Sequence, residues 1–201
     1  LFIGPAIGGG LILHGDVVRG RSGNAADVAV MPVLPSSLAS APRPKGTWDI
    51  LLTRASLGAL ARHLTPGTGL RPSRSDLEQA IAGGRPEVAE WLDDCIDALT
   101  PTVRAGHALL DVPLVVVDCD VDGGMLAQLL ARLQAALETN APEARNAPRV
   151  ERGSFGQDAG ALGAASLPMF FNFSPRASIL TGGTKAGTVN GTARSEMLPR
   201  D

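Results

Sequence analysis

The chain has 201 residues and a mass of 20.7 kDa, which fits one domain with a tail and excludes a large multidomain machine. It is 44% hydrophobic and 19% charged, so it can bury a core and is not a disordered polyelectrolyte. Its formal net charge of -2 argues against a nucleic-acid surface made by this segment itself.

Apolar runs separated by glycines predict short strands at the N-terminus. Leu1–Ile3 and Leu11–Leu13 are the first two, and Asp16–Arg19 is the third. His14-Gly15 lies between the last two, and a residue followed by glycine suits a type I′ hairpin turn. Residues 32–44 then carry four prolines, which predicts a long loop.

Helical periodicity follows the loop. It predicts a helix over about Ser56–His63. Ser75–Glu78 has the pattern of a capping box, for a short helix that ends at Gly83-Gly84. A longer apolar stripe over Pro86–Leu110 predicts another helix, in which Pro101 introduces a kink or a break.

The next segment has the pattern of a crossover unit. Leu114–Val117 is apolar without alternation, which predicts a central strand buried on both faces. A helix over Met125–Leu137 and a strand over Arg149–Arg152 complete the right-handed unit. Asp158–Phe171 is rich in Ala, Leu and Gly and predicts a closely packed buried helix, whereas residues 181–201 predict a flexible tail.

The chain has two cysteines and three histidines, which are far apart in the sequence: Cys95, Cys119, His14, His63 and His107. This distribution excludes a four-ligand zinc spacing and a disulfide framework, so we expect a cytoplasmic protein without a bound metal. No apolar run approaches the ~20 residues of a membrane helix, and no signal-peptide pattern is present. The chain opens inside an apolar segment without methionine, so we expect it to be a piece of a longer protein.

Two segments could bind a ligand. Residues 4–10, here called the glycine loop, contain Gly4, Gly8, Gly9 and Gly10, whose backbone amides could close on a phosphate. A plain glycine turn is the alternative, and Pro5 supplies no N–H.

The second segment is polar and follows the predicted hairpin. Asn24 and Asp27 could hydrogen-bond vicinal sugar hydroxyls, because an amide and a carboxylate together donate and accept. The alternative is a loop in which one of the two caps the following helical turn.

The order of these motifs resembles the ROK family (repressor, open reading frame, kinase). The resemblance covers residues 1–180 and is carried by IGPAIGGGLILHGDVVRGRSGNAADVAVMP, RAS, LVVVDC and GSFGQDAGALGAASLPMF. It implies the C-terminal lobe of a ribonuclease-H-like, actin-like (ASKHA) α/β fold, a three-layer structure with helices on both faces of a mixed sheet. A Pro-rich insertion at about residues 32–47 and the FFNFSP ending are most similar to the ROK transcriptional regulators, in which a winged helix precedes two lobes.

The resemblance also implies a degenerate nucleotide site. Kinases of the family have the phosphate loop G-T-G-x-G-G-G, and here Pro5 stands at the threonine and Ala6 at the next glycine. The glycine pair at the adenosine position is Cys119-Asp120, and a carboxylate there would repel phosphate.

The sugar segment of the family is altered as well. Its pattern is G-N-A-G-E-x-G-H, so Asn24 is retained, Asp27 replaces the glutamate and Val30 replaces the histidine. A later sugar-binding glutamate aligns with Leu52. The cysteine-rich zinc motif of the family is missing from residues 32–46, so no zinc is expected.

These departures favour the effector-sensing and dimerisation lobe of a ROK-type transcriptional regulator, without catalytic residues or a cofactor. We expect a homodimer, a small sugar-like effector at Asn24 and Asp27, no membrane contact, and DNA contact only through an N-terminal domain absent from this chain. The alternative is the C-terminal lobe of a ROK sugar kinase, in which ATP phosphorylates a hexose-like substrate and the missing N-terminal lobe supplies the catalytic aspartate. A third hypothesis is an interaction module that only self-associates.

Overall fold

The computed structural model describes residues 1–69, 71–121, 124–139, 141 and 146–173, and the side chains of residues 170–173 are outside this description. The tail expected at residues 181–201 therefore lies outside the described residues. No helix in the described part of the chain is both long and apolar enough to cross a bilayer.

A four-stranded mixed sheet in the order β2-β1-β7-β8 forms the centre of the molecule. β1 (Phe2–Ile3) pairs antiparallel with β2 (Ile7–Gly8) and parallel with β7 (Leu114–Cys119). β7 in turn pairs parallel with β8 (Arg149–Arg152). The expected α/β architecture is confirmed, but β2 lies inside the glycine loop, where we expected only a turn.

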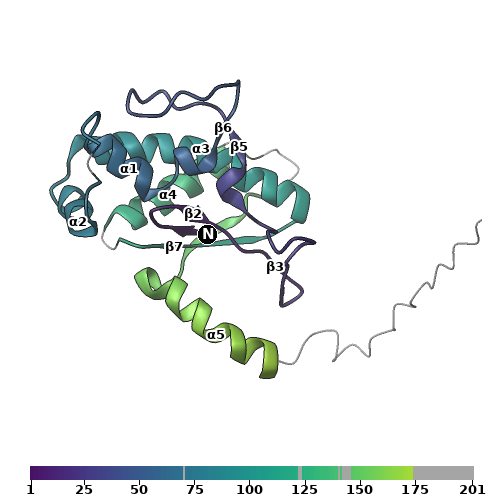
Figure 1. Cartoon of the computed structure of the whole chain (residues 1–201). Helices are drawn as coiled ribbons and strands as arrows, with labels where there is room; N and C mark the ends of the chain where they lie inside the picture. Colours follow the sequence, from purple (N-terminus) through teal and green to yellow (C-terminus); the bar gives the residue numbers. More distant parts are fainter. Residues whose placement is uncertain (70, 122–123, 140, 142–145, 174–201) are drawn as a thin grey trace, which may run out of the picture.

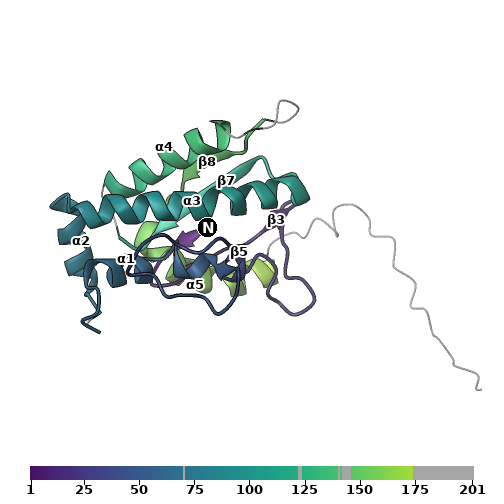
Figure 2. The same ribbon diagram turned by 90° about the horizontal axis from the view of Figure 1, so that it is seen from above.

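β7 and β8 are joined by helix α4 (Gly124–Thr139), which makes the predicted crossover unit. α4 and the long helix α3 (Pro86–Leu110) lie on one side of the sheet (Figures 1 and 2). Apolar side chains from both helices are fully buried beneath them, among them Trp91, Leu99, Leu129 and Leu133. α3 continues through Pro101, so of the expected kink or break the break is absent.

Two shorter helices precede α3. α1 (Leu57–Leu64) begins where the periodicity predicted, because the Ser56 hydroxyl caps it by accepting a hydrogen bond from the Ala59 amide. α2 (Arg74–Ala82) has a capping box, but its members are Ser73 and Asp76 instead of Ser75 and Glu78. The predicted helix is therefore present and its capping residues were misplaced by two positions.

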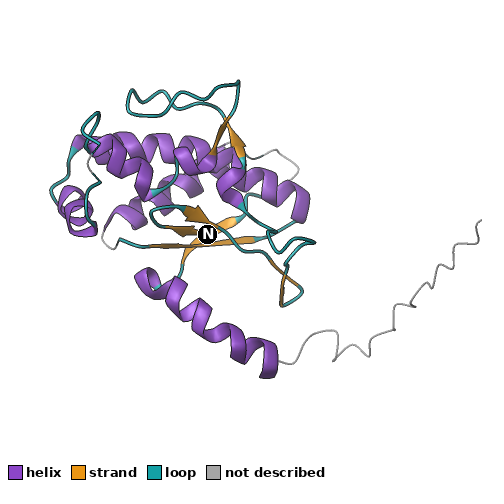
Figure 3. Cartoon of the chain, viewed as in Figure 1, coloured by secondary structure: helices purple, strands orange, loops and turns teal. Residues whose placement is uncertain are grey.

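Two short strand pairs lie outside the main sheet. β3 (Ile12–Leu13) and β4 (Asp16–Val17) form the expected hairpin, with His14 and Gly15 at φ of 53° and 83° as a type I′ turn requires. β5 (Pro32–Val33) and β6 (Asp49–Ile50) close the base of the Pro-rich insertion, which projects on the side of α3 away from the sheet (Figure 3).

Single 3-10 turns connect these elements. They are η1 (Val28–Val30), η2 (Leu51–Thr53) and η3 (Gly156–Asp158). η2 carries the chain from β6 into α1, and η3 carries it from β8 into the last helix.

Two expectations about burial were wrong. Leu114 and Val116 in β7 are 36% and 44% exposed, so this strand is not buried on both faces along its whole length. The last helix, α5 (Ala159–Phe173), lies on the side of the sheet opposite α3 and α4, and its residues 160–169 are exposed instead of buried (Figure 1). Its composition predicted the helix but carried no information about which surface would cover it.

Candidate functional site

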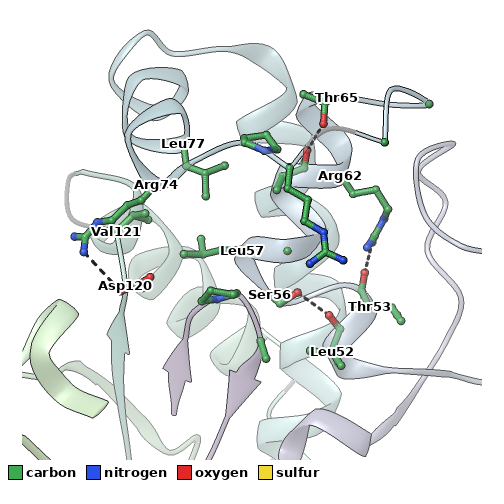
Figure 4. A pocket seen from close by; sticks show the side chains of 18 residues that line it. Leu52, Thr53, Ser56, Leu57, Arg62, Thr65, Arg74, Leu77, Asp120 and Val121 are labelled. Atoms are coloured by element: carbon green, nitrogen blue, oxygen red, sulfur yellow. Dashed lines mark hydrogen bonds and ion pairs between the residues drawn. The ribbon is translucent and has the colours of Figure 1, made fainter. Parts of the chain in front are cut away.

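A cavity of about 690 Å³ opens where the glycine loop meets α1, α2 and the end of β7 (Figure 4). This volume is in the range of small-molecule pockets. The side chains that matter below come from five segments: Pro5 and Ala6; Leu52, Thr53 and Ser56; Leu57 and Arg62; Arg71, Arg74 and Leu77; and Asp120 and Val121.

The register of the sheet brings the two predicted nucleotide-binding segments together. β1 and β7 are parallel neighbours with Ile3 opposite Cys119, and the Asp120 amide donates to the Ile3 carbonyl at 2.9 Å. Both strands therefore end at the same edge, where ligands of open α/β sheets bind. Pro5, Ala6 and Asp120 meet in one cavity as a result.

The start of α1 approaches the glycine loop closely. The Leu57 amide donates to the Gly4 carbonyl at 2.8 Å, and a Cβ added at Gly58 would lie 2.7 Å from the Pro5 carbonyl oxygen. Gly58 is therefore required by this approach. The sequence analysis missed it, although a single glycine inside a helical pattern is a signal of close backbone contact.

The four glycines expected to cradle phosphate are not among the residues that line the cavity: Gly4, Gly8, Gly9 and Gly10. The Gly4 amide donates to the Ala6 carbonyl at 3.0 Å, and Pro5 has no amide hydrogen. Gly9 faces the next segment, since a Cβ there would lie 2.9 Å from the Ala26 carbonyl oxygen. The loop thus offers little of the amide cradle that binds phosphates.

Asp120 lies beside Arg74, which also pairs with Glu78. Its carboxylate is 3.7 Å from Arg74 Nη1, and Arg74 Nε donates to Glu78 at 2.9 Å. Cys119 is buried, and this burial, with a smaller contribution from Asp120, raises the pKa of its thiol to about 11. Cys119 is therefore a poor nucleophile at neutral pH, as a buried core cysteine should be.

Asn24 and Asp27 lie outside this cavity and are exposed. The backbone bends sharply between them, with Ala26 at a φ of 63° and the Asp27 amide 3.3 Å from the Asn24 carbonyl oxygen. Asp27 stands at the N-cap of η1 without a side-chain capping hydrogen bond, so the alternative that it acts as a cap is wrong. Val30 is 59% exposed on the same segment, whereas Leu52 lines the cavity.

Arginines are the feature of the cavity that the sequence analysis missed. Arg62 comes from the last turn of α1. Basic residues are common there because they interact favourably with the helix dipole, so the sequence position does not indicate a site. Its Nε donates to the Ser40 carbonyl at 3.0 Å and its Nη2 to the Thr53 carbonyl at 2.6 Å. Burial lowers the pKa of Arg62, and attraction to Asp49 and Asp94 opposes this only in part.

A second arginine, Arg54, forms a closed cluster between η2 and α3. It is 3% exposed, and its guanidinium donates to Asp94 at 2.6 and 3.1 Å and to Asp97 at 2.8 Å. Ser36 of the Pro-rich insertion also donates to Asp94, at 2.8 Å. These four residues, here called the Arg54 cluster, attach the insertion to α3.

A serine, a histidine and a glutamate are linked near the same insertion. Ser40 Oγ is 2.7 Å from His63 Nδ1, and His63 Nε2 is 2.8 Å from Glu90 Oε2. A hydroxyl, an imidazole and a carboxylate linked in this order have the arrangement of a nucleophile, a base and an orienting carboxylate. Ser40 is not a lining residue of the cavity, and the three residues connect the insertion to α1 and α3.

The described residues contain no group of three or more His, Cys, Asp or Glu that could hold a metal ion. No protein-family model matches the chain, and no curated protein matches it.

Solved structures do match. The ROK hexokinase from Thermus thermophilus is 23% identical, with 82% of this chain and 54% of that chain covered at a TM-score of 0.60. A ROK family glucokinase from Streptomyces griseus, in complex with glucose and AMPPNP, is 22% identical over 83% of this chain and 58% of that chain, at 0.62. The chain has the ROK fold.

A ROK family transcriptional regulator, a homolog of the E. coli MLC protein, shares this fold too. It is 22% identical over 82% of this chain and 43% of that chain, with a TM-score of 0.54. The chain spans a little over half the length of the two kinases and less than half the length of this regulator. The ROK fold thus occurs in both functional classes, and the residues of the site must distinguish them.

Proposed function

We propose that the chain is the effector-sensing and dimerisation lobe of a ROK-type transcriptional regulator and that it does not catalyse phosphoryl transfer. The observation that carries this proposal is the meeting of Pro5, Ala6 and Asp120 in one cavity. A kinase needs amide and hydroxyl donors around the phosphates, because catalysis of phosphoryl transfer is almost entirely positioning and electrostatic stabilisation. Here the loop presents a proline ring, a methyl group and, across from them, a carboxylate.

The proposed mechanism is a population shift. A small sugar-like effector would contact Asn24 and Asp27, which are exposed at a bend of the backbone. Binding would favour one arrangement of this lobe relative to the rest of a regulator and so change the spacing of paired DNA-binding domains. DNA contact and the second lobe belong to parts of such a regulator that this chain does not span.

The second candidate is the C-terminal lobe of a ROK sugar kinase. It is favoured by the survival of a cavity of ligand size at the edge where β1 and β7 end. The matched hexokinase and glucokinase show that the fold can carry sugar phosphorylation in other proteins.

Nucleotide binding separates the two candidates, because it does not require the second lobe to perform chemistry. We expect that magnesium-AMPPNP leaves the thermal unfolding midpoint of the chain unchanged, with or without glucose. A ligand present at 100 times its Kd would raise the free energy of unfolding by about 2.7 kcal/mol. A saturable, magnesium-dependent rise in the midpoint would overturn the regulator proposal in favour of the kinase.

Dimerisation is tested by sedimentation equilibrium. We expect a species of twice the 20.7 kDa chain mass. A monomer at every concentration would contradict the dimerisation part of the proposal and leave the effector part to be judged by ligand binding.

A further inference from the structure

The charges that line the cavity are unequal. Three arginines, Arg62, Arg71 and Arg74, face it together with one carboxylate, Asp120. Arg74 already has ion pairs with Glu78 and Asp120. Among the described residues, the lining arginines without an ion pair within 4.0 Å are therefore Arg62 and Arg71.

The guanidinium of Arg62 has more N–H donors than hydrogen-bond partners. A guanidinium has five N–H groups, and those of Arg62 make hydrogen bonds to two carbonyl oxygens, from Ser40 and Thr53. Within the described part of the chain, no carboxylate is within 4.0 Å of its nitrogens. Partial burial lowers the pKa of Arg62, and the attraction of the more distant Asp49 and Asp94 offsets this only in part.

The rest of the wall is apolar. Leu57 and Leu77 lie between Arg62 on one side of the cavity and the Arg74–Asp120 pair on the other, and Val121 lies beside that pair (Figure 4). The surface that lines the cavity is mostly apolar, and an inorganic anion would leave it uncovered, whereas a neutral apolar ligand would form no ion pair with Arg62. A ligand with both an anionic group and an apolar body satisfies both.

We infer that the cavity binds an organic anion, with its carboxylate or phosphate group at Arg62 and its apolar body against Leu57, Leu77 and Val121. The orientation follows from Asp120, which repels an anion at the opposite side. This site is separate from Asn24 and Asp27, and it goes beyond the proposed function, on which it rests only in treating the ligand as an effector.

The test is isothermal titration of the full chain, without magnesium, with two anionic probes, benzoate and phenyl phosphate. Benzyl alcohol, which has the same apolar body without the charge, and inorganic phosphate, which has no body, are the matched ligand controls. We expect at least one anionic probe to bind about tenfold or more tightly than both controls, as a charge-assisted hydrogen bond provides. Equal affinity for benzyl alcohol would overturn the inference, and so would the absence of binding by both anions at roughly 10 mM.

Variants locate the site. R62Q should weaken the tighter probe about tenfold or more, and D120N should strengthen it by a few-fold, because a repelling charge is removed. R85Q is the matched control, since Arg85 is exposed, pairs with Glu87 and does not line the cavity. Unchanged affinity in both R62Q and D120N would overturn the assignment. D120N keeps the test decisive if R62Q does not fold, since Asp120 pairs with Arg74 and not with the groups that hold Arg62.

The outcomes separate this inference from the proposed function. Anion binding without magnesium-AMPPNP binding supports both. Absence of anion binding overturns the inference alone, and the regulator proposal then depends on an effector at Asn24 and Asp27. Magnesium-dependent AMPPNP binding that displaces the anionic probe overturns both, because the cavity would then be a nucleotide site.

Discussion

The Arg54 cluster and the cavity wall at Arg62 are neighbouring regions that each contain an arginine, and the two arginines differ in their ion pairing. Arg54 is almost completely buried and is satisfied by Asp94 and Asp97. Burial lowers its pKa, but the hydrogen bonds and attraction of the two aspartates outweigh this, so the net pKa is raised. For Arg62 the net pKa is lowered. The difference distinguishes an arginine that is paired within the protein from one that we propose pairs with a ligand.

The positions of the carboxylates explain this difference. α3 presents Asp94 and Asp97 toward η2, where Arg54 reaches them. Arg62 lies near the other end of α1, where it donates to the carbonyl groups of Ser40 and Thr53. Removing one partner of a buried ion pair strongly destabilises the folded protein, because a charge stays buried without compensation. A partly exposed cation without a partner costs much less, because solvent screens it.

The largest effect is expected for Arg54→Met. It leaves Asp94 buried without its cation, so we expect a loss of about 3–5 kcal/mol in the free energy of unfolding. Urea denaturation measures it. The double variant Arg54→Met, Asp94→Leu should recover part of the loss, because it removes the uncompensated charge. A loss below about 1 kcal/mol in the single variant would contradict the structural role of the cluster.

Gly58→Ala tests the approach of α1 to the cavity wall. The added methyl would be 2.7 Å from the Pro5 carbonyl, so the loop or the helix must shift, at a cost of about 1–3 kcal/mol. The matched control is Gly106→Ala in α3, where nothing lies within 4 Å of the added Cβ. There the better helix propensity of alanine should stabilise the protein by up to about 1 kcal/mol. Effects of equal sign in the two variants would contradict the close approach.

Arg62→Met keeps the apolar stem and removes the cation. Two hydrogen bonds to carbonyls are lost, so we expect a decrease of about 1 kcal/mol in the free energy of unfolding, well below that of Arg54→Met. Urea denaturation of the two variants under identical conditions is the measurement. Equal losses would show that both arginines are structural and would remove the contrast between the two regions.

The smallest effect is expected for Arg71→Gln at the exposed edge of the cavity. Its unfolding free energy should stay within about 0.5 kcal/mol of the parent, as for most surface substitutions. Its affinity for the anionic probes should fall less than that of R62Q, because an exposed charge is screened by solvent and salt. A larger fall than in R62Q would move the anionic group from Arg62 to Arg71.

Local patterns predicted most elements well. The ends of α1 and β8, the type I′ turn at His14-Gly15 and the crossover through α4 depend on neighbouring residues, and each was confirmed. β2 was missed because it consists of Ile7 and Gly8 and is a strand only through its pairing with β1. The burial of α5 was wrong for a similar reason, since composition does not state which surface a helix faces.

The candidate site shows the same division. The replacements at Pro5 and Ala6 could be identified from motif positions, and the loss of amide and hydroxyl donors follows from the residues themselves. The roles of Gly58 and Arg62 could not, because they depend on the distance between α1 and the glycine loop and on the carboxylates that other helices present.

The sequence by itself determined the α/β class, the order of the longer strands and helices, and the scarcity of phosphate-binding donors in the glycine loop, because these follow from local periodicity and residue type. Only the tertiary structure decided that Pro5 and Asp120 share a cavity, that Arg54 is neutralised and that Arg62 is not. The physical reason is that electrostatic compensation and cavity shape are sums over residues far apart in the chain, and the parallel pairing of β1 with β7 and the packing of α3 against η2 set those distances.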